Sequence, residues 1–225
     1  MESNRSEQPM RYFRVNNFEE CHKGFQYRTG LNVLRDKFND DPTASCVAGG
    51  LYFTDIDHIH KFIAYREDSF WLREVFLPKD DPNFKMVKDP EGDKYRANSF
   101  ILGKRYLLFD MNTFAMLSEY GCLFSKDAGW RIYYYSFVNS RLHHYVEDPN
   151  NITNEARYVL ENHSEIFKNA EIQKRCQSSG YLYNVISVYK SFADEQRRQR
   201  KYDAGVGAMI GAILVAGLFS FFIKG

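Results

Sequence analysis

LYFTDIDHIHKFIAYREDSFWLREVFL, residues 51–77, holds the clearest secondary-structure signals in this chain. Its first four residues, 51–54, predict a short strand. Asp55 is an N-cap candidate, and apolar residues at helical spacing follow it, so we expect a helix that ends near Ala64. Residues 70–77 predict a second strand. Short strands around a short helix are typical of an α+β fold, and we expect a small mixed or antiparallel sheet.

The same patterns predict further elements on both sides of this stretch. Alternating apolar residues indicate strands, and capped runs with apolar residues at helical spacing indicate helices. Segments rich in Asp, Asn, Gly and Pro predict the loops between them. The expected elements are strands at residues 11–15, 84–87 and 100–102, helices at residues 31–38 and from Asn112 or Thr113 to Tyr120, and either a strand or a helix at residues 133–138.

Composition divides the chain into four expected parts. A polar N-terminus precedes the α+β head domain, and the DPNN sequence at residues 148–151 ends that domain. Thr153 then caps the first helix of a stalk, which has an apolar face and ends in basic residues. The parts are residues 1–10, a mobile N-terminus; 11–147, the head domain; 148–201, the helical stalk; and 204–223, a C-terminal transmembrane helix.

Charge and cysteine content exclude several classes of function. Lys and Arg total 30 and Asp and Glu total 29, so no excess of positive charge would draw the whole chain to nucleic acid. The four cysteines are far apart and form no C-x-x-C pair, which indicates neither a zinc ribbon nor a disulfide framework. We therefore expect reduced thiols, no metal and no nucleic-acid partner. The cysteines are Cys21, Cys46, Cys122 and Cys176.

The segment AGVGAMIGAILVAGLFSFFI, residues 204–223, carries no charged residue. About 20 helical residues at about 1.5 Å each span roughly 30 Å, which is the thickness of the hydrocarbon core of a bilayer. A buried helix of a globular domain would usually show a polar face, and this segment offers only Ser220. The sequence therefore predicts a transmembrane anchor, with the lipid bilayer as a partner.

Basic residues flank the expected anchor unequally. A basic cluster precedes it, whereas Lys224 alone follows it. Because basic residues are enriched on the cytosolic side of membrane spans, the N-terminal side should face the cytosol. With so few residues after the span, the chain resembles tail-anchored membrane proteins, which insert after synthesis. The cluster consists of Arg197, Arg198, Arg200 and Lys201.

Small residues within the expected anchor indicate how it could associate. Gly207 and Gly211 form a G-x-x-x-G pattern, in which small side chains let two helices approach closely in lipid. This pattern favours a homodimer or packing against another membrane protein. Gly is also frequent in membrane spans in general, so the alternative that the pattern has no role stays open.

Four segments of the head domain carry a resemblance: HKGFQYRTGLNVL at residues 22–34, GGLYFTDIDHIHKFIAY at residues 49–65, LREVFLP at residues 72–78 and RANSFILGKRYLLFD at residues 96–110. They are similar to an uncharacterised domain at the N-termini of ankyrin-repeat and related proteins of giant viruses related to Mimivirus. The resemblance covers about half of the chain, roughly residues 12–117. It implies a viral protein in a host endomembrane or in the membrane inside a virion.

The residues GLYFTD at positions 50–55 and the helix expected at residues 57–65 look like a strand and a helix of the ADP-ribosyltransferase fold. In those enzymes a His-Gly or Arg-Gly pair holds the amide of the nicotinamide, and a tyrosine stacks on its ring. The resemblance implies NAD as the cofactor if the site is active. The candidate NAD-binding residues are His22, Lys23, Gly24, Tyr52 and Phe53.

That family also needs a glutamate on a later strand, where a carboxylate stabilises the positive charge that develops as nicotinamide leaves. Ser99 occupies the position that the alignment gives to this glutamate. A hydroxyl carries no negative charge, and losing such a stabiliser costs about 3 kcal/mol, or about a hundredfold in rate. We therefore expect no catalytic residue and no cofactor, unless Glu74 or Glu119 replaces the missing carboxylate.

Together these observations predict a tail-anchored viral membrane protein whose cytosol-facing head binds a protein partner without catalysis. One alternative is a mono-ADP-ribosyltransferase that uses NAD and modifies proteins at the membrane. Another is a structural virion protein that links the internal membrane to the capsid. The three hypotheses share the membrane anchor and differ in what the head does.

Overall fold

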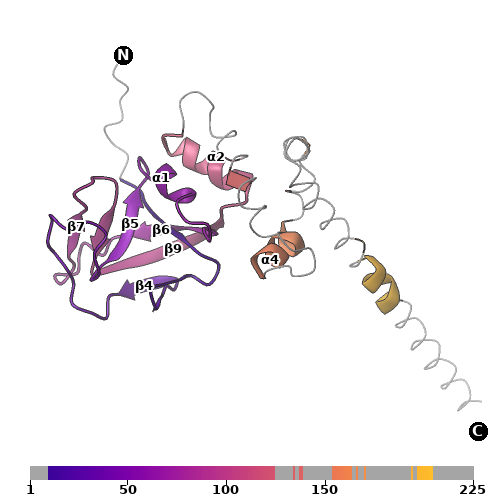
Figure 1. The fold of residues 1–225 in the computed structure, drawn as a ribbon, viewed down its shortest axis with the longest axis horizontal. Helices are drawn as coiled ribbons and strands as arrows, with labels where there is room; N and C mark the ends of the chain where they lie inside the picture. Colours follow the sequence, from indigo (N-terminus) through magenta and orange to yellow (C-terminus); the bar gives the residue numbers. More distant parts are fainter. Residues whose placement is uncertain are drawn as a thin grey trace, which may run out of the picture.

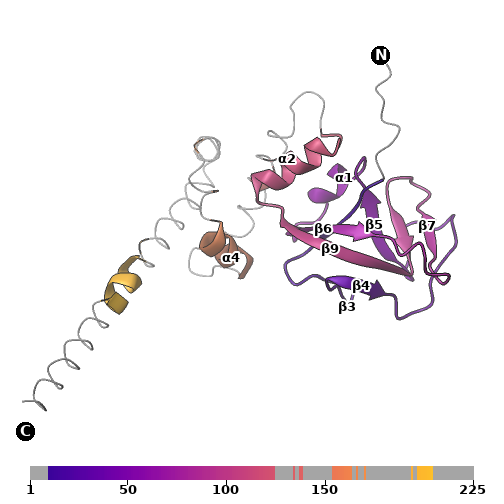
Figure 2. The same cartoon turned by 180° about the vertical axis from the view of Figure 1, so that it is seen from behind.

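The head domain of the computed structural model is built on a seven-stranded sheet in which all neighbouring strands are antiparallel. Helices α1 (His60–Ile63) and α2 (Met111–Glu119) lie on one face of this sheet (Figure 1 and Figure 2). The predicted α+β class is confirmed, and the antiparallel sheet is larger than expected. The structure describes residues 10–124, 134, 137, 138, 154–163, 166, 170, 194 and 197–204.

Seven strands form the main sheet, and two short strands form a separate hairpin. The strands of the main sheet are β1 (Tyr12–Asn16), β4 (Gly30–Val33), β5 (Leu51–Asp55), β6 (Trp71–Phe76), β7 (Met86–Lys88), β8 (Tyr95–Ala97) and β9 (Ser99–Leu107). The hairpin consists of β2 (Cys21–His22) and β3 (Phe25–Gln26). The order across the main sheet is β4-β9-β6-β1-β5-β8-β7, which puts β1 in the centre, between β6 and β5.

The helix predicted at residues 31–38 is wrong. Its first part is β4, which pairs with β9 at the edge of the sheet. Leu31 and Val33 alternate with the buried Asn32 and are 60% and 54% exposed. Leu31, Leu34 and Phe38 have the apolar spacing of a helix, but the pairing of residues 30–33 with β9 makes this segment a strand.

The other predicted strands are confirmed, and the predicted helices begin at different residues. The confirmed strands correspond to β1, β5, β6, β7 and β9, of which β9 is several residues longer than predicted. The helix expected after Asp55 is a turn followed by the single-turn α1, although Asp55 Oδ1 accepts a hydrogen bond from His58 N at 3.0 Å, as a cap does. Asp110, and not Asn112 or Thr113, caps α2, because its Oδ1 accepts from Asn112 N at 2.9 Å.

Apolar side chains pack on both faces of the sheet. On the face that α1 and α2 cover, Phe13 and Phe114 belong to one buried cluster. On the opposite face, Phe53 and Tyr27 belong to a second cluster. Because successive side chains of a strand point to opposite faces, β1 directs Phe13 to the first cluster and Arg14 towards the second. This alternation places the guanidinium of Arg14 beside the ring of Tyr27.

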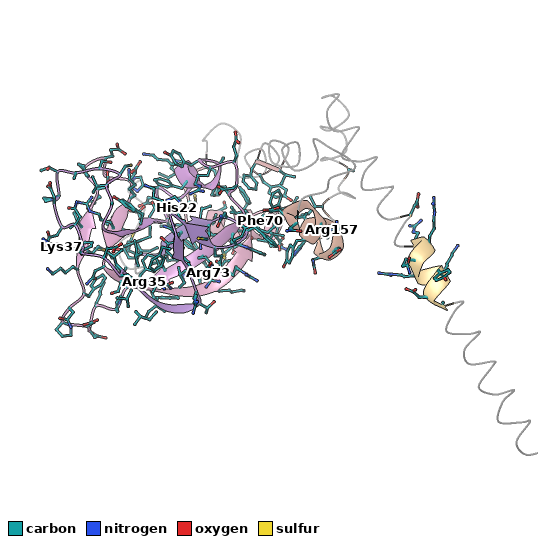
Figure 3. All side chains as sticks on the ribbon, turned by 60° about the horizontal axis from the view of Figure 1, so that its bottom comes forward. His22, Arg35, Lys37, Phe70, Arg73 and Arg157 are labelled. Carbon is teal, nitrogen blue, oxygen red and sulfur yellow. The ribbon has the colours of Figure 1, made fainter. Side chains whose placement is uncertain are left out.

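Helix α4 (Asn154–Asn162) packs against the head domain. The centroid of the Tyr158 ring lies 6.0 Å from that of Phe70, and Val159 is buried in the same cluster as Phe70. Figure 3 shows Phe70 at the side of the head nearest to Arg157 on α4. The first part of the predicted stalk therefore shares the hydrophobic core of the head. Thr153, its predicted cap, lies outside the described residues.

The described C-terminal segment, residues 197–204, is helical and exposed. It contains the predicted basic cluster, Arg197, Arg198, Arg200 and Lys201. Within the described residues, none of the helices combines the length and the apolar character that a bilayer crossing needs. The anchor predicted at residues 204–223 lies outside the described residues except for Ala204, and so do Gly207 and Gly211. Residues 133–138 are described only at Tyr134, Phe137 and Val138, and all three are helical.

Candidate functional site

A cavity of about 100 Å³ opens where β1 and β5 separate. The two strands pair only at Tyr12 with Asp55 and at Phe13 with Thr54, whereas β1 pairs with β6 along five residues. Beyond Phe13, no neighbouring strand therefore fills the space on the β5 side of β1. Side chains from α1, from the turn at residues 66–69 and from the β2–β3 hairpin surround this space and line the cavity.

Arg14 is the buried cation of this cavity, with 9% of its surface exposed. Its Nε donates to Asn16 Oδ1 at 2.7 Å, and its Nη1 donates to the main-chain oxygen of Tyr52 across the gap between β1 and β5. The guanidinium carbon lies 4.0 Å from the centroid of the Tyr27 ring. Among the described residues, no carboxylate lies within ion-pair distance of Arg14. The positive charge of Arg14 is therefore not neutralised by a carboxylate in direct contact.

Arg14 belongs to a row of three arginines on neighbouring strands. It pairs with Arg73 of β6, and Arg73 pairs with Arg105 of β9. Glu20 serves this row: its carboxylate lies 3.5 Å from Arg73 Nε and 4.0 Å from Arg105 Nη1, and it accepts a hydrogen bond from Asn16 Nδ2 at 3.2 Å. One carboxylate beside three guanidiniums leaves this part of the sheet with an excess of positive charge.

Arg66 brings another guanidinium to the cavity and is held by two neighbours. Its Nε and Nη2 donate to the two carboxylate oxygens of Asp68 at 2.8 and 2.6 Å, and its Nη1 contacts His22 Nδ1. Partial burial, followed by the charges of Arg14 and Arg66, lowers the pKa of His22 to about 4. His22 is therefore neutral near pH 7, and its Nδ1 accepts the hydrogen bond from Arg66.

Ser69 adds a polar group without a partner. Its side chain lines the cavity and is 1% exposed, yet its Oγ makes no hydrogen bond with any described residue. An unpaired buried hydroxyl costs about 1 to 3 kcal/mol. Ser69 N donates to the main-chain oxygen of Arg66 at 3.2 Å, so one turn places this hydroxyl and a guanidinium at the same cavity.

The structure brings three of the five candidate NAD-binding residues, His22, Tyr52 and Phe53, to this cavity. Lys23 and Gly24 do not line it. They are the exposed turn residues of the β2–β3 hairpin, with φ values of 49° and 77°. Positive φ at both positions is typical of a two-residue type I′ turn. The turn alone therefore explains the glycine at position 24, and no role in ligand binding is needed.

The two aromatic candidates differ in what they offer a ligand. Phe53 is a core residue, 3% exposed, and its ring stacks on that of Tyr95 with 5.5 Å between centroids. Tyr52 is partly exposed, and its hydroxyl donates to the main-chain oxygen of Val47 at 2.8 Å. Of this pair, Tyr52 is therefore the side chain that retains surface for a ligand.

The carboxylate that ADP-ribosyl transfer would need is not at this cavity. Ser99 begins β9, at the strand start predicted for it, but β6 separates β9 from β1, and Ser99 does not line the cavity. Glu74 and Glu119 do not line it either. Asp68 is the one carboxylate among the described lining residues, and Arg66 engages both its oxygens. No three potential metal ligands gather anywhere in the described part of the chain.

Sequence patterns did not single out Arg14, Arg66 or Ser69. A signal for Arg14 was present in YFRVN, residues 12–16, where polar residues alternate with apolar ones. Such alternation is usual for a strand with one solvated face, and only the full sheet shows that both faces of β1 are covered. Arg66 and Ser69 lie in a turn whose approach to β1 depends on the whole fold, so no local pattern marks them.

The chain is similar to several proteins of Acanthamoeba polyphaga mimivirus. It is 49% identical to R868, which is named as an ankyrin repeat protein, over 110 residues that make up 49% of this chain and 53% of R868. It is 46% identical to the uncharacterised protein R869 over 110 residues, 49% of this chain and 77% of R869. A further mimivirus protein named for ankyrin repeats is 32% identical over 183 residues, 80% of this chain and 29% of that protein.

These likenesses define the class of the molecule as a giant-virus protein with an α+β head. The chain belongs to the same family as mimivirus protein R869, and the resemblance predicted from the sequence is confirmed. The matched length of 110 residues agrees with the predicted coverage of about half of the chain. This chain spans about half the length of R868. No family model and no solved structure matches it.

Proposed function

We propose that this giant-virus protein is anchored in a membrane by residues 204–223 and that its head binds a protein partner there without catalysis. The observation that carries the proposal is the uncharged run at residues 204–223, which as a helix is long enough to cross the hydrocarbon core. The described helix at residues 197–204 supports it, because its basic side chains are exposed and within the reach of anionic headgroups if the anchor is inserted.

The basic cluster before the anchor orients the head towards the cytosol. In that orientation the head meets its partner at the surface of a host endomembrane or of the membrane inside a virion. Gly207 and Gly211 allow two anchors to approach closely, so the membrane-bound form is a homodimer in this proposal. The exposed head then presents two copies of its surface to the partner.

The cavity supports a binding role over a catalytic one. Its lining has two arginines and an electrically neutral His22, while its carboxylate, Asp68, is engaged on both oxygens by Arg66. Stabilisation of the positive charge that develops as nicotinamide leaves would need a carboxylate that faces the ligand. Arrangements of this kind bind anions and do not stabilise an oxocarbenium ion.

Alkaline extraction of membranes tests the anchor. The full chain, expressed in eukaryotic cells, should stay in the membrane pellet at high pH. Leu214→Arg with Leu218→Arg should release it, because charged side chains at the centre of a span are strongly unfavourable in lipid. Leu214→Ile with Leu218→Ile is the matched control and should stay in the pellet. Release of the wild-type chain would contradict the proposal.

The glycosylation acceptor sequences within residues 148–201 test the orientation. Asn151 and Asn162 each begin an N-x-[ST] pattern, and Asn162 is exposed at the end of α4. A head in the cytosol never meets the glycosylation machinery, so glycosidase treatment should leave the gel mobility of the expressed chain unchanged. A glycosidase-sensitive shift would place the head on the other side of the membrane.

A mono-ADP-ribosyltransferase that uses NAD is the second candidate function. The observation in its favour is that His22 and Tyr52 line one cavity. Incubation of the full chain with labelled NAD separates the two functions. The binding proposal predicts no covalent label on the chain or on added proteins, whereas label that Tyr52→Ala abolishes would establish the transferase.

A further inference from the structure

The lining of the cavity between β1 and β5 carries more positive than negative charge. Its charged side chains are Arg14, Arg66, Lys94 and Asp68. Asp68 is bound by Arg66, which leaves Lys94 and Arg14 to be compensated. The partners of Lys94 Nζ are Asp89 at 3.4 Å, Glu91 at 2.8 Å and Asp93 at 3.7 Å. Arg14 therefore remains the cation without a carboxylate in contact.

Both arginines still have N–H donors to offer. A guanidinium carries more N–H groups than Arg14 uses in its bonds to Asn16 and Tyr52, and more than Arg66 uses with Asp68 and His22. These bonds also fix the orientation of each guanidinium, so a ligand would not have to order them. Arg66 Nη1 contacts His22 Nδ1, and both arginines line the same cavity as His22.

The unpaired hydroxyl of Ser69 is an independent sign of a ligand. Protein interiors rarely leave a buried polar atom without a partner, and a bound water, ion or ligand can supply the missing hydrogen bond. Ser69 is one of the residues that line the cavity, and its buried Oγ has no partner among the described residues. A hydroxyl can donate to an anion, as the two guanidiniums can.

We infer that this cavity binds a single phosphate group of a small molecule, with Arg14, Arg66 and the Ser69 hydroxyl as donors to its oxygens. A carboxylate could be satisfied by one bidentate arginine, whereas a phosphate has enough oxygens for several donors and enough negative charge for two guanidiniums. A cavity of about 100 Å³ has room for a group of a few heavy atoms. The site is therefore matched to phosphate in charge, donor number and size.

Aromatic residues at the same cavity could contact the part of the ligand that carries the phosphate. Phe62 and Tyr65 of the α1 region line it, and Tyr65 is 75% exposed. A ring that stacks on Tyr65 would bury apolar surface that is otherwise in water. The expected ligand is thus a phosphate monoester on a planar or apolar body, either a soluble molecule or a lipid headgroup. This inference requires neither the membrane anchor nor the protein partner.

Titration calorimetry on the full chain in detergent tests the site, with phenyl phosphate as the probe. Phenyl phosphate should bind more tightly than inorganic phosphate, which lacks the ring, and phenol, which lacks the charge, should not bind measurably. Arg66→Gln should weaken phenyl phosphate about tenfold or more, because it removes a charged donor. The exposed Arg35→Gln, outside the cavity, is the matched control and should bind as the wild type does.

Ser69→Ala separates a ligand donor from a structural residue. It should weaken phenyl phosphate binding about fivefold, the effect of one hydrogen bond, and raise the melting temperature of the unliganded chain by removing an unpaired buried hydroxyl. A serine with a structural role would lower that temperature. Equal affinity of phenyl phosphate for the wild type, Arg66→Gln and Ser69→Ala, or no binding to the wild type at millimolar concentration, would overturn the inference.

Nanodiscs distinguish the two sources of the phosphate. The full chain is reconstituted in phosphatidylcholine, with and without phosphatidic acid, and titrated with phenyl phosphate. The site takes a lipid headgroup if phosphatidic acid lowers the affinity of the wild type for phenyl phosphate but leaves the weaker affinity of Arg66→Gln unchanged. If the affinity is the same in both discs, the site takes a soluble phosphate ester. Either result supports a phosphate site.

Discussion

Arg14 and Arg73 lie directly opposite one another on the adjacent antiparallel strands β1 and β6. Both side chains are buried, and like charges in this position repel each other. The fold compensates with Glu20, which lies within ion-pair distance of Arg73 and is linked to Arg14 through Asn16. Glu20 itself adopts a left-handed backbone conformation, φ 54°, at the turn where it reaches this row. The central strand of the sheet therefore depends on one carboxylate from a loop.

Replacing Glu20 by Gln should destabilise the protein by about 3 kcal/mol, because it leaves the buried Arg73 without a carboxylate while it preserves the shape of the side chain. Glu19→Gln, at the exposed neighbouring position, is the matched control and should change stability by less than about 0.5 kcal/mol. Denaturant unfolding of the two variants measures the difference. Equal stabilities would show that the arginine row does not need Glu20.

Two glycines that both have close neighbours should respond differently to substitution by Ala. A Cβ at Gly50 would lie 2.8 Å from Cβ of Arg96, which is fully buried and donates to the main-chain oxygens of Asn39 and Ala44 at 2.8 and 2.6 Å. Arg96 cannot move, so Gly50→Ala should cost about 2 kcal/mol.

Gly103→Ala is the variant to compare with Gly50→Ala, because its close neighbour can move. Its Cβ would meet the ring of Phe76, which is 53% exposed and can turn into solvent. We expect a cost of about 0.5 kcal/mol or less in thermal or denaturant unfolding. A larger cost for Gly103→Ala than for Gly50→Ala would mean that Phe76, and not Arg96, is the rigid neighbour.

Local sequence patterns predicted most of the strands, because whether a short segment forms a strand depends largely on its own residues. The strands at residues 51–54 and 70–77 follow from apolar runs that are buried on the sheet, and the structure confirms both. The error at residues 31–38 arose because Leu31 and Val33 lie on an edge strand, where exposure of apolar residues depends on which strand pairs with which. Strand order is a property of the whole sheet, which no window of the sequence contains.

The candidate site was predictable only in part, for a related reason. His22 and Tyr52 were identified from motif spacing, and both line the cavity. Arg14, Arg66 and Ser69 were not, because their significance lies in a shortage of partners that appears only when three distant segments meet. A sequence reveals which residues are polar, while the fold decides which of them remain unpaired.

The pH dependence of stability should contain a contribution from His22. Its pKa is about 4 in the folded protein and about 6.5 when unfolded, so the unfolded state binds more protons between these values. This contribution is therefore present in full above pH 6.5 and is lost as the pH falls towards 4. The difference in unfolding free energy between the wild type and His22→Gln should decrease as the pH is lowered from 6.5 to 4.

Proton NMR gives the direct check on His22. Its ring resonances should titrate with a midpoint near pH 4 in the folded chain. A midpoint near 6.5 would mean that neither burial nor the positive charges of Arg14 and Arg66 act on the ring, and would contradict the assignment of its Nδ1 as the acceptor for Arg66.

Cysteine alkylation should follow burial. Cys46 is exposed, whereas Cys122 is buried, and burial raises the pKa of the Cys122 thiol to about 12. Because the thiolate is the nucleophile, iodoacetamide at about pH 8 should modify Cys46 rapidly and Cys122 only after unfolding. Peptide mapping by mass spectrometry measures both rates. Equal rates in the native protein would contradict the packing of the segment that follows α2.

Flotation measures whether residues 204–223 hold the protein in a bilayer. The full chain is purified in detergent, mixed with phosphatidylcholine liposomes, freed of detergent and centrifuged through a density gradient. The chain should float with the liposomes, and high salt should not release it, because burial of apolar surface and not charge retains it. A monodisperse chain that stays at the bottom of the gradient without detergent would contradict the claim.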